Sequence, residues 1–468
     1  MIPTEKSVRG LQRFGLGARP GDLSRVQSDP VGALQAEIDR PRVTLLTNAD
    51  LPSTPEATAA FEEFSDARRK GLARRKPAEG GASMEPPRRG AAMDRDPQRA
   101  ILRKPQGIYL AEVGARFEFA QKADCGFAER LVWFWSNHFA ISARASRLRV
   151  IAGAYEREAI RPHVLGRFVD MLLAVEQHPA MIGYLDNYLS IGPNSPAGSR
   201  RGRGLNENFA REILELHTLG VNSGYSQEDV IALAKILTGW TVGDRNREGR
   251  GTFVFNRHRH EPGAHKVLSK VYPEDGVEQG RAVLADLARH PATAKFIATK
   301  LVRHFVADEP PPDLVAHLAD TFDKTDGDLA KVSRALIEAP AAWEPQATKL
   351  RTPQEFVAAM MRATDVPMEG PQLVRLLTTI GQQPWLPGGP DGFPDTAASW
   401  MSPSGMRGRL DVAAVVGRRA EGDSDPKTLI GQILGTVPSK ETRSAVAAAD
   451  SRAQGLAILF SSPEFQRR

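Results

Sequence analysis

The sequence predicts an all-α, multi-helix assembly with at most one short β-hairpin, and three observations support this class. Apolar residues recur at spacings of three and four along most of the 468 residues, as on one face of a helix. Neither a βαβ rhythm nor the glycine fingerprint of a dinucleotide-binding fold occurs. Strand-like alternation is confined to 252–255 and 267–272, which we expect to pair as a hairpin.

The expected helices follow one another along the chain, and two of them begin with recognisable signals. Ser226 with Asp229 three residues later is typical of a helix N-cap, and Pro353 after Thr352 suits a first helical position. The segments with helical periodicity are 112–122, 127–139, 168–174, 207–219, 228–237, 280–287, 292–306, 313–322, 328–337, 353–362 and 453–460.

A chain of this length exceeds what one hydrophobic core usually serves, so we expect two or three lobes. Residues 76–98 are rich in Pro, Gly and Arg, which offers little apolar area against the entropy of ordering and predicts a mobile loop. The predicted division is an N-terminal helical segment (1–75), that loop (76–98), a central helical region with the candidate site (99–250), a hairpin insertion (251–275) and a C-terminal helical region (276–468).

Composition excludes several classes of protein. Hydrophobic residues make up 41% and charged residues 25%, which argues against wholesale disorder. The net charge of +6, from 62 basic and 56 acidic residues, is a weak excess, so a nucleic-acid partner is not expected. The basic run 68–76 favours a solvated helix face, with a nucleic-acid or lipid contact as the alternative. Cys125 is the single cysteine, which excludes an intramolecular disulfide and a thiolate zinc site.

No segment approaches the roughly 20 apolar residues of a membrane span. The N-terminal residues contain no apolar core of a signal peptide. We therefore expect a soluble protein in the cytoplasm, with export by an unrecognised route as the alternative.

Several ordered blocks carry a family resemblance. They are Trp-Phe-Trp-Ser-Asn-His-Phe at 133–139, the helix at 206–220, 229–240 ending in Leu-Thr-Gly-Trp, 260–268, Lys-Leu-Arg-Thr-Pro-Gln-Glu-Phe at 349–356, and the Trp-Leu-Pro…Gly-Phe-Pro…Trp stretch at 385–400. They resemble the bacterial family catalogued as domain of unknown function 1800, from about residue 9 to the C-terminus. The resemblance implies a helical fold, no established reaction and a sulfatase-like partner protein, and many members of the family carry export signals.

The helix from Asn206 is the most informative element. Its face with Phe209 and Ile213 must pack inward, whereas Asn208 and Glu212, four residues apart, share a polar face. One interpretation is that Asn208 and Glu212 look into a cleft and bind a metal or polar substrate. The alternative is capping by Asn206 or Asn208 with ordinary helix pairs, Arg211 lying four residues from both Glu207 and Glu215. We expect His217 to be a packed histidine, because five residues separate it from Glu212.

Histidines supply further candidates. His138 lies beside an aromatic stripe, where it is either a core histidine or a metal ligand, general base or haem ligand. No CxxCH occurs, so covalent haem is excluded and non-covalent haem stays open. His258 and His260 alternate with arginines and would face one side of a strand, as two metal ligands or as a solvated edge. We prefer His260 over His258 and His265, because His260 matches the family block.

The segment 192–204 before the Asn206 helix is a candidate anion site. Free backbone N–H groups at a helix start favour negative charge, and Arg200, Arg201 and Arg203 could clamp phosphate, sulfate or carboxylate; a solvated loop is the alternative. Asp186 and Asn187 close the preceding helix, as caps or as oxygen ligands. We expect the ends of 184–188 and of the Asn206 helix to border one polar cleft.

The turn at 388–395, flanked by Trp385 and Trp400, suits sugar or peptide recognition, with structural turn packing as the alternative.

The function that the sequence favours is a metal- or anion-binding helical protein. One hypothesis is an enzyme acting on a polar or anionic substrate, and the alternative is a non-enzymatic accessory protein for the sulfatase-like partner. Oxygen and imidazole ligands would suit Mn, Mg, Zn or non-haem Fe. The predicted catalytic residues are His138, Glu212 and His260; the predicted ligand-binding residues are Asp186, Asn187, Arg200, Arg201, Arg203, Asn208 and Arg211; the predicted metal ligands are His138, Asp186, Glu212 and His260.

Overall fold

The computed structural model describes residues 3–48, 50–73, 97–201, 204–245, 249–344 and 348–468. The predicted loop 76–98 lies almost wholly outside these described residues. In the part of the basic run that they include, Arg68, Arg69 and Lys70 are exposed on a helix, which fits a solvated face.

Helices dominate the described part of the chain, which confirms the predicted class. The first half contains α1 (Pro3–Arg9), the π-turn η1 (Gly10–Phe14), α2 (Asp22–Val26), α3 (Pro30–Asp39), α4 (Thr54–Ala73), α5 (Pro97–Lys122), α6 (Phe127–His138), α7 (Ser146–Arg149), α8 (Ala152–Tyr155), the π-turn η3 (Glu156–Ile160), α9 (Phe168–Glu176), α10 (Pro179–Tyr184), η4 (Asn187–Leu189), α11 (Gly198–Arg201), α12 (Asn208–Glu212), the π-turn η5 (Ile213–His217) and α13 (Gln227–Ile236).

The second half begins with four short strands and returns to helices. Its elements are β1 (Trp240–Val242), β2 (Phe253–Phe255), η6 (Arg257–Arg259), β3 (His265–Val267), β4 (Lys270–Tyr272), α14 (Val277–Ala288), α15 (Pro291–Phe305), α16 (Pro312–Lys324), α17 (Leu329–Glu338), η7 (Pro340–Ala342), α18 (Pro353–Thr364), α19 (Gly370–Thr379), α20 (Ala397–Trp400), α21 (Pro403–Ala420), α22 (Pro426–Leu434), α23 (Lys440–Ala447), α24 (Arg452–Ser461) and α25 (Pro463–Gln466).

The predicted helix starts are confirmed. Ser226 and Asp229 form a reciprocal capping box at the start of α13, and Thr352 and Glu355 form another at α18, where Pro353 is the first helical residue. Each box satisfies two backbone N–H groups that a helix start leaves without partners.

The predicted pairing of 252–255 with 267–272 is wrong. β2 pairs with β1, placing Phe255 opposite Trp240, and β3 pairs with β4, placing Val267 opposite Lys270. The second hairpin closes on itself because Leu268 takes a left-handed conformation (φ 55°) in a two-residue turn. A long connection separates β1 from β2, so strand periodicity alone does not reveal that they pair.

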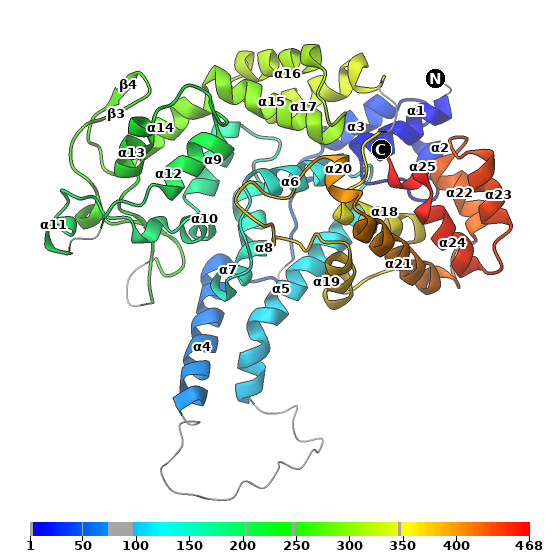
Figure 1. Cartoon of the computed structure of the whole chain (residues 1–468), viewed down its shortest axis with the longest axis horizontal. Helices are drawn as coiled ribbons and strands as arrows, with labels where there is room; N and C mark the ends of the chain where they lie inside the picture. Colours follow the sequence, from blue (N-terminus) through cyan, green and yellow to red (C-terminus); the bar gives the residue numbers. More distant parts are fainter. Residues whose placement is uncertain (1–2, 49, 74–96, 202–203, 246–248, 345–347) are drawn as a thin grey trace, which may run out of the picture.

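The centre of the molecule is formed by α5, α6 and α18, and the later helices surround it (Figure 1). Every residue of α18 is buried, and so are the first nine residues of α6 and His138. None of the helices in the described ranges combines the length and apolar character that a bilayer crossing requires. α6 and α18 are therefore core helices that bring charged residues, such as Glu129, Arg130 and Glu355, into the interior.

These interior charges are paired. Arg161, at the end of η3, lies 2.7 Å from Glu129 and 2.9 Å from Glu156, and Arg116 of α5 lies 2.9 Å from Glu156. Two indole N–H groups donate to the same carboxylates, Trp133 to Glu129 at 2.8 Å and Trp385 to Glu156 at 3.1 Å. The network joins α5, α6, η3 and the segment after α19, because each charge needs a partner away from water.

Replacing Arg161 with leucine should destabilise the fold by about 3–5 kcal/mol, because Glu129 and Glu156 would lose their shared buried cation. The matched control is Arg167→Leu, which removes a half-exposed pair with Asp326 and should cost less than about 1 kcal/mol. Urea unfolding of both variants measures the difference. Equal losses of unfolding free energy would contradict this account of the network.

Candidate functional site

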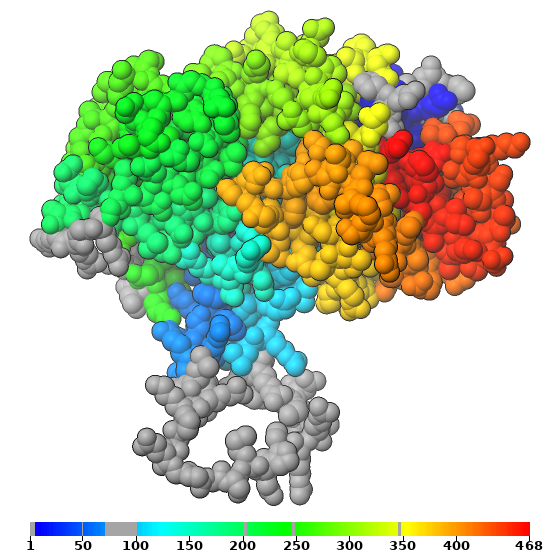
Figure 2. Space-filling model, in the orientation of Figure 1, coloured from blue at the N-terminus to red at the C-terminus, as the bar shows by residue number. Residues whose placement is uncertain are grey.

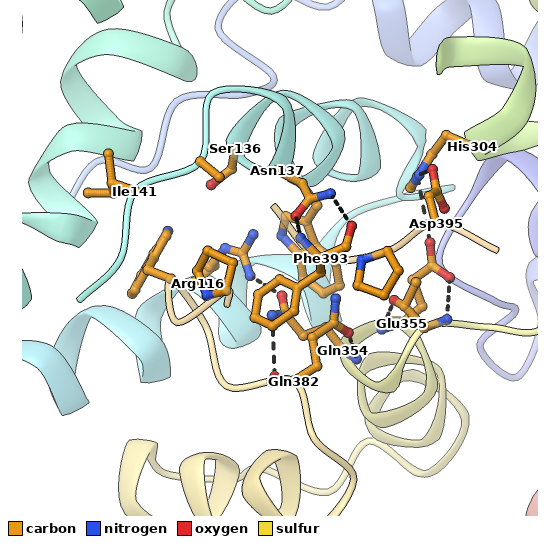
Figure 3. A pocket seen from close by; sticks show the side chains of 16 residues that line it. Arg116, Ser136, Asn137, Ile141, His304, Gln354, Glu355, Gln382, Phe393 and Asp395 are labelled. Atoms are coloured by element: carbon orange, nitrogen blue, oxygen red, sulfur yellow. Dashed lines mark hydrogen bonds and ion pairs between the residues drawn. The ribbon is translucent and has the colours of Figure 1, made fainter. Parts of the chain in front are cut away.

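A narrow pocket lies where α5, α6, α15 and α18 meet the segment 382–395 (Figure 3). About 50 Å³ of it is open to water-sized molecules. Figure 3 places His304 and Asp395 at one end, Arg116 towards the other, and Phe393 between them. The helices fix the position of these side chains, because α5, α6 and α18 form the buried centre and α15 packs with its buried face inward.

The first end of the pocket holds a histidine paired with an aspartate. His304 Nδ1 donates to Asp395 Oδ2 at 2.8 Å, which leaves the imidazole lone pair on Nε2. His304 Nε2 has no hydrogen-bond partner among the described residues and lies 3.7 Å from Glu355 Oε1. Burial and the nearby Arg130 and Arg468 lower the pKa of His304, so its imidazole is neutral at pH 7.

Both carboxylates at this end stay ionised despite their burial. Burial opposes ionisation of Asp395, but His304 and Lys349 outweigh it and lower the pKa of Asp395. Glu355 lies 2.9 Å from Arg130 and 2.9 Å from Arg468, whose charges outweigh burial and hold the pKa of Glu355 well below its usual range. The first end of the pocket therefore presents one neutral imidazole nitrogen beside two fixed negative charges.

The opposite end holds Arg116. Its guanidinium lies 4.6 Å from the ring centre of Trp133 and 5.4 Å from that of Trp385, within cation–π range of both. Its Nη1 donates to Gln354 Oε1 at 2.6 Å, and Gln354 N donates to Gln382 Oε1 at 3.0 Å. Two tryptophans and two amides thus hold this guanidinium in one orientation.

The segment 388–395 covers the pocket, and Asn137 fastens it. Asn137 Nδ2 donates to Phe393 O at 2.9 Å, while Phe393 N donates to Asn137 Oδ1 at 2.7 Å. Gly392 has φ 83°, and a Cβ there would lie 2.5 Å from Asn137 O, so the close approach requires glycine. In Figures 1 and 2 this segment, in orange, runs across the front of the central helices.

Three blocks that carry the family resemblance converge on this pocket. They are 133–139 on α6, 349–356 at the start of α18, and 385–400 after α19. Sequence reasoning singled out His138 and the turn 388–395 within them but missed Arg116, His304, Glu355 and Asp395 as site residues. Convergence of the blocks is the signal that could have found Glu355 and Asp395, whereas His304 lies in a helix with no local motif.

His138 does not line the pocket. It is placed as a core histidine, which is one of the two interpretations that the sequence left open. It is buried, and its Nε2 donates to His217 O at 3.1 Å. His217 is fully buried as predicted, with Nδ1 donating to Glu176 at 2.7 Å. It lies on a π-turn, so the argument from its five-residue separation from Glu212 on a regular helix does not apply. Glu212 is half-buried in this neighbourhood, and burial raises its pKa above the ordinary value.

His260 and Asp186 lie elsewhere. His260 is buried against Phe255 and contacts Thr238 O through Nδ1 at 3.0 Å. The expectation that His258 and His260 face one side of a strand is wrong, because 257–259 forms a 3-10 turn that leaves His258 exposed. Asp186 pairs with Arg147 at 3.3 Å, and Asn187 is a buried donor to the backbone of Leu237 and Trp240.

The predicted ends of 184–188 and of the Asn206 helix do meet. Asn206 Nδ2 donates to Asp186 O at 3.2 Å, and Asn206 Oδ1 accepts from the exposed Asn208 at 3.0 Å. Arg211 lies 3.2 Å from Glu207 and 3.5 Å from Glu215, which confirms the predicted helix pairs.

The predicted anion contacts of the arginines in the preceding loop fall outside the described part of the structure. Arg200 and Arg201 belong to α11, with side chains beyond those described, and Arg203 lies outside the described residues.

The four predicted metal ligands do not form one site. Within the described ranges, no group of three or more His, Cys, Asp or Glu side chains is arranged to hold a metal ion. The physical reason is that His138, Asp186, Glu212 and His260 occur on separate elements, and three of them already have other partners: the backbone for His138 and His260, and Arg147 for Asp186.

Stability should fall as pH drops below about 6.5. Burial lowers the pKa of His138 well below its ordinary value of 6.5, so the unfolded chain takes up a proton there before the folded chain does. This stability is fully present above pH 6.5 and is lost as pH falls towards the folded pKa. Replacing His138 with Gln, which keeps a donor, should reduce the slope of unfolding free energy by up to about 1.4 kcal/mol per pH unit.

Urea unfolding at several pH values between 7 and 5 measures this slope. Replacing the exposed His317 with Gln is the control and should leave it unchanged. An unchanged slope in the His138 variant would show that His138 is not held neutral by burial.

Comparison with known proteins gives a family and no further relative. The model of the family described as protein of unknown function (DUF1800) matches residues 9–467, nearly the whole chain. No curated protein and no solved structure matches the chain. The resemblance of the ordered sequence blocks is confirmed, and the chain belongs to the DUF1800 family.

Proposed function

We propose that the chain is an acid–base enzyme, that the pocket around His304 is its active site, and that His304 is the proton acceptor. The observation that carries the proposal is the pairing of His304 Nδ1 with Asp395, which leaves the lone pair on Nε2, a buried nitrogen of a pocket-lining residue without a described hydrogen-bond partner. A general base requires this combination of a fixed tautomer, a neutral ring and an available nitrogen.

His304 would take a proton from a bound water or a substrate hydroxyl through Nε2 and return it to the leaving group. The imidazolium formed in between would be stabilised by Asp395 at 2.8 Å and by Glu355 at 3.7 Å. Asp395 acts as a positioning residue, because it touches His304 rather than the reacting atoms. Lys349 holds the backbone of Asp395 by donating to its carbonyl at 2.6 Å.

The narrow, covered shape of the pocket supports a reaction rather than loose binding. Phe393 and Pro394 line one side of it, so a proton transfer inside is partly shielded from bulk water. The divalent metal, the sulfatase-like partner and the cytoplasmic location expected from the sequence stay predictions, since no contact among the described residues bears on them.

Replacing His304 with Gln should lower turnover by about 10²–10⁴-fold, the usual contribution of a general base. A panel of short-chain esters and amides provides the assay, with the release of acid followed by a pH indicator. The rate of the unmodified protein should rise with pH to a plateau, with a midpoint below 6.5, since the base must be unprotonated. Asp395→Asn should shift this profile, and His317→Gln is the control. Turnover that survives His304→Gln would refute the assignment.

A second readout needs no substrate. Nitrogen NMR of histidine-labelled protein, with the His304 signals assigned from their absence in the variant, should show Nδ1 protonated and Nε2 unprotonated at pH 7. A proton on Nε2 at that pH would also refute the proposal.

A further inference from the structure

We propose that the pocket recognises a small carboxylate, with the guanidinium of Arg116 as the group that binds it. The inference rests on the proposed active site and adds the chemical class of its substrate: a short-chain carboxylic acid, or the carboxylate-bearing end of a larger molecule. Arg116 lines the pocket at the end opposite His304.

Arg116 has a donor to spare. Its Nε is committed to Glu156 and its Nη1 to Gln354, whereas Nη2 donates to no described residue. The stacking of this guanidinium near Trp133 and Trp385 fixes the direction of the remaining N–H groups. A guanidinium whose geometry is already fixed loses little freedom when it binds a carboxylate.

The size of the pocket restricts the ligand. A cavity needs roughly 10–15 Å³ of such open volume to hold one water molecule, so the available 50 Å³ accommodates only a few heavy atoms. A sugar ring or a nucleotide exceeds this open volume. A carboxylate with a short carbon chain does, and the side chains of Ile141 and Trp133 provide apolar contact for that chain.

Buried cations offset the carboxylates at the His304 end of the pocket. In the described interior around Glu355, five cationic side chains (Arg130, Arg351, Arg409, Arg468 and Lys349) accompany three carboxylates (Glu355, Asp395 and Asp308). Arg351 Nη1, Arg409 Nη1 and Arg468 Nη2 are buried without a hydrogen-bond partner among the described residues. None of these five cations lines the pocket, so they offset the carboxylates at the His304 end and leave the anion to be bound by Arg116 at the opposite end.

The carboxylates at the His304 end restrict the charge of that ligand. Glu355 and Asp395 would repel a doubly charged phosphate or sulfate, whereas a monocarboxylate can place its charge at Arg116 and its neutral end towards His304. The reacting group of the substrate then lies next to the imidazole. In this arrangement the Arg116 end of the pocket binds the carboxylate, and the His304 end transfers the proton.

Thermal unfolding at constant ionic strength tests the assignment, with acetate, propionate and lactate as probes and acetamide and propionamide as uncharged counterparts. The carboxylates should raise the unfolding temperature saturably, and the amides, phosphate and sulfate should not. Failure of all three carboxylates, or equal effects of acids and amides, would overturn the proposal. Stabilisation by phosphate or sulfate alone would overturn it in favour of a different anion.

Two variants locate the binding. Arg116→Lys keeps the charge beside Glu156 but loses the planar donor, and should weaken propionate binding at least tenfold by titration calorimetry. Ala140→Phe fills the pocket without removing an ion pair and should abolish binding; it serves as the second test if the lysine variant does not fold. Arg167→Lys is the exposed control. Unchanged propionate affinity in the folded Arg116 or Ala140 variant would overturn the assignment.

The His304→Gln variant separates the two proposals. It should still bind propionate, because His304 lies at the other end of the pocket. If turnover is lost in that variant and no carboxylate binds to the protein, the proposed active site stands and only the proposed substrate class is refuted. If carboxylates bind but turnover does not depend on His304, the proposed acid–base chemistry is refuted and the proposed carboxylate site stands.

Discussion

The pairing of guanidinium groups with carboxylates inside the molecule is the constraint on which the rest of the structure depends. Arg116, Arg130 and Arg161 are almost fully buried, and each requires an anion because an isolated charge away from water is too costly to keep. Glu156 is central, since it accepts from Arg116, Arg161 and Trp385. Helices that are distant in sequence must therefore meet at fixed positions.

Such pairs contribute specificity of arrangement more than net stability. The desolvation of two buried charges offsets most of their attraction, so apolar packing could hold these helices together at least as well. An ionic network accepts only one register, because a shift of one helix turn would leave every charge unpaired. The same register positions His304 on α15 against Asp395 and Arg116 on α5 against the two tryptophans, so the pocket follows from the constraint.

The sequence predicted the helical class and the starts of α13 and α18, because periodicity and capping are local properties of the chain. It predicted the packed His217 and the pairs of Arg211 for the same reason. It did not predict the partner of β2, nor the meeting of His304 with Asp395, which are 91 residues apart. Contacts of that kind depend on tertiary arrangement.

The choice of site residues shows the same limit. His138 and His260 attracted attention as histidines beside aromatic or basic residues, but each forms a hydrogen bond with a nearby backbone carbonyl. The sequence around His304 gave no sign of a site, because its partner Asp395 lies in a distant segment. The resemblance blocks contained the better signal, since residues from three of them line one pocket. Only the three-dimensional structure shows that those blocks lie next to one another.

The π-turn at 213–217 determines how this helix tolerates insertion and deletion. A π-turn holds one residue more than an α-helical turn, and that residue carries His217 to Glu176. Deleting one residue from this turn would restore ordinary helix and swing His217 by about 100° away from Glu176. Glu176 would then be a buried carboxylate without its imidazole partner, and His138 would lose the carbonyl it contacts. A one-residue change of length here would therefore break the same contact with Glu176 that a replacement of His217 would break.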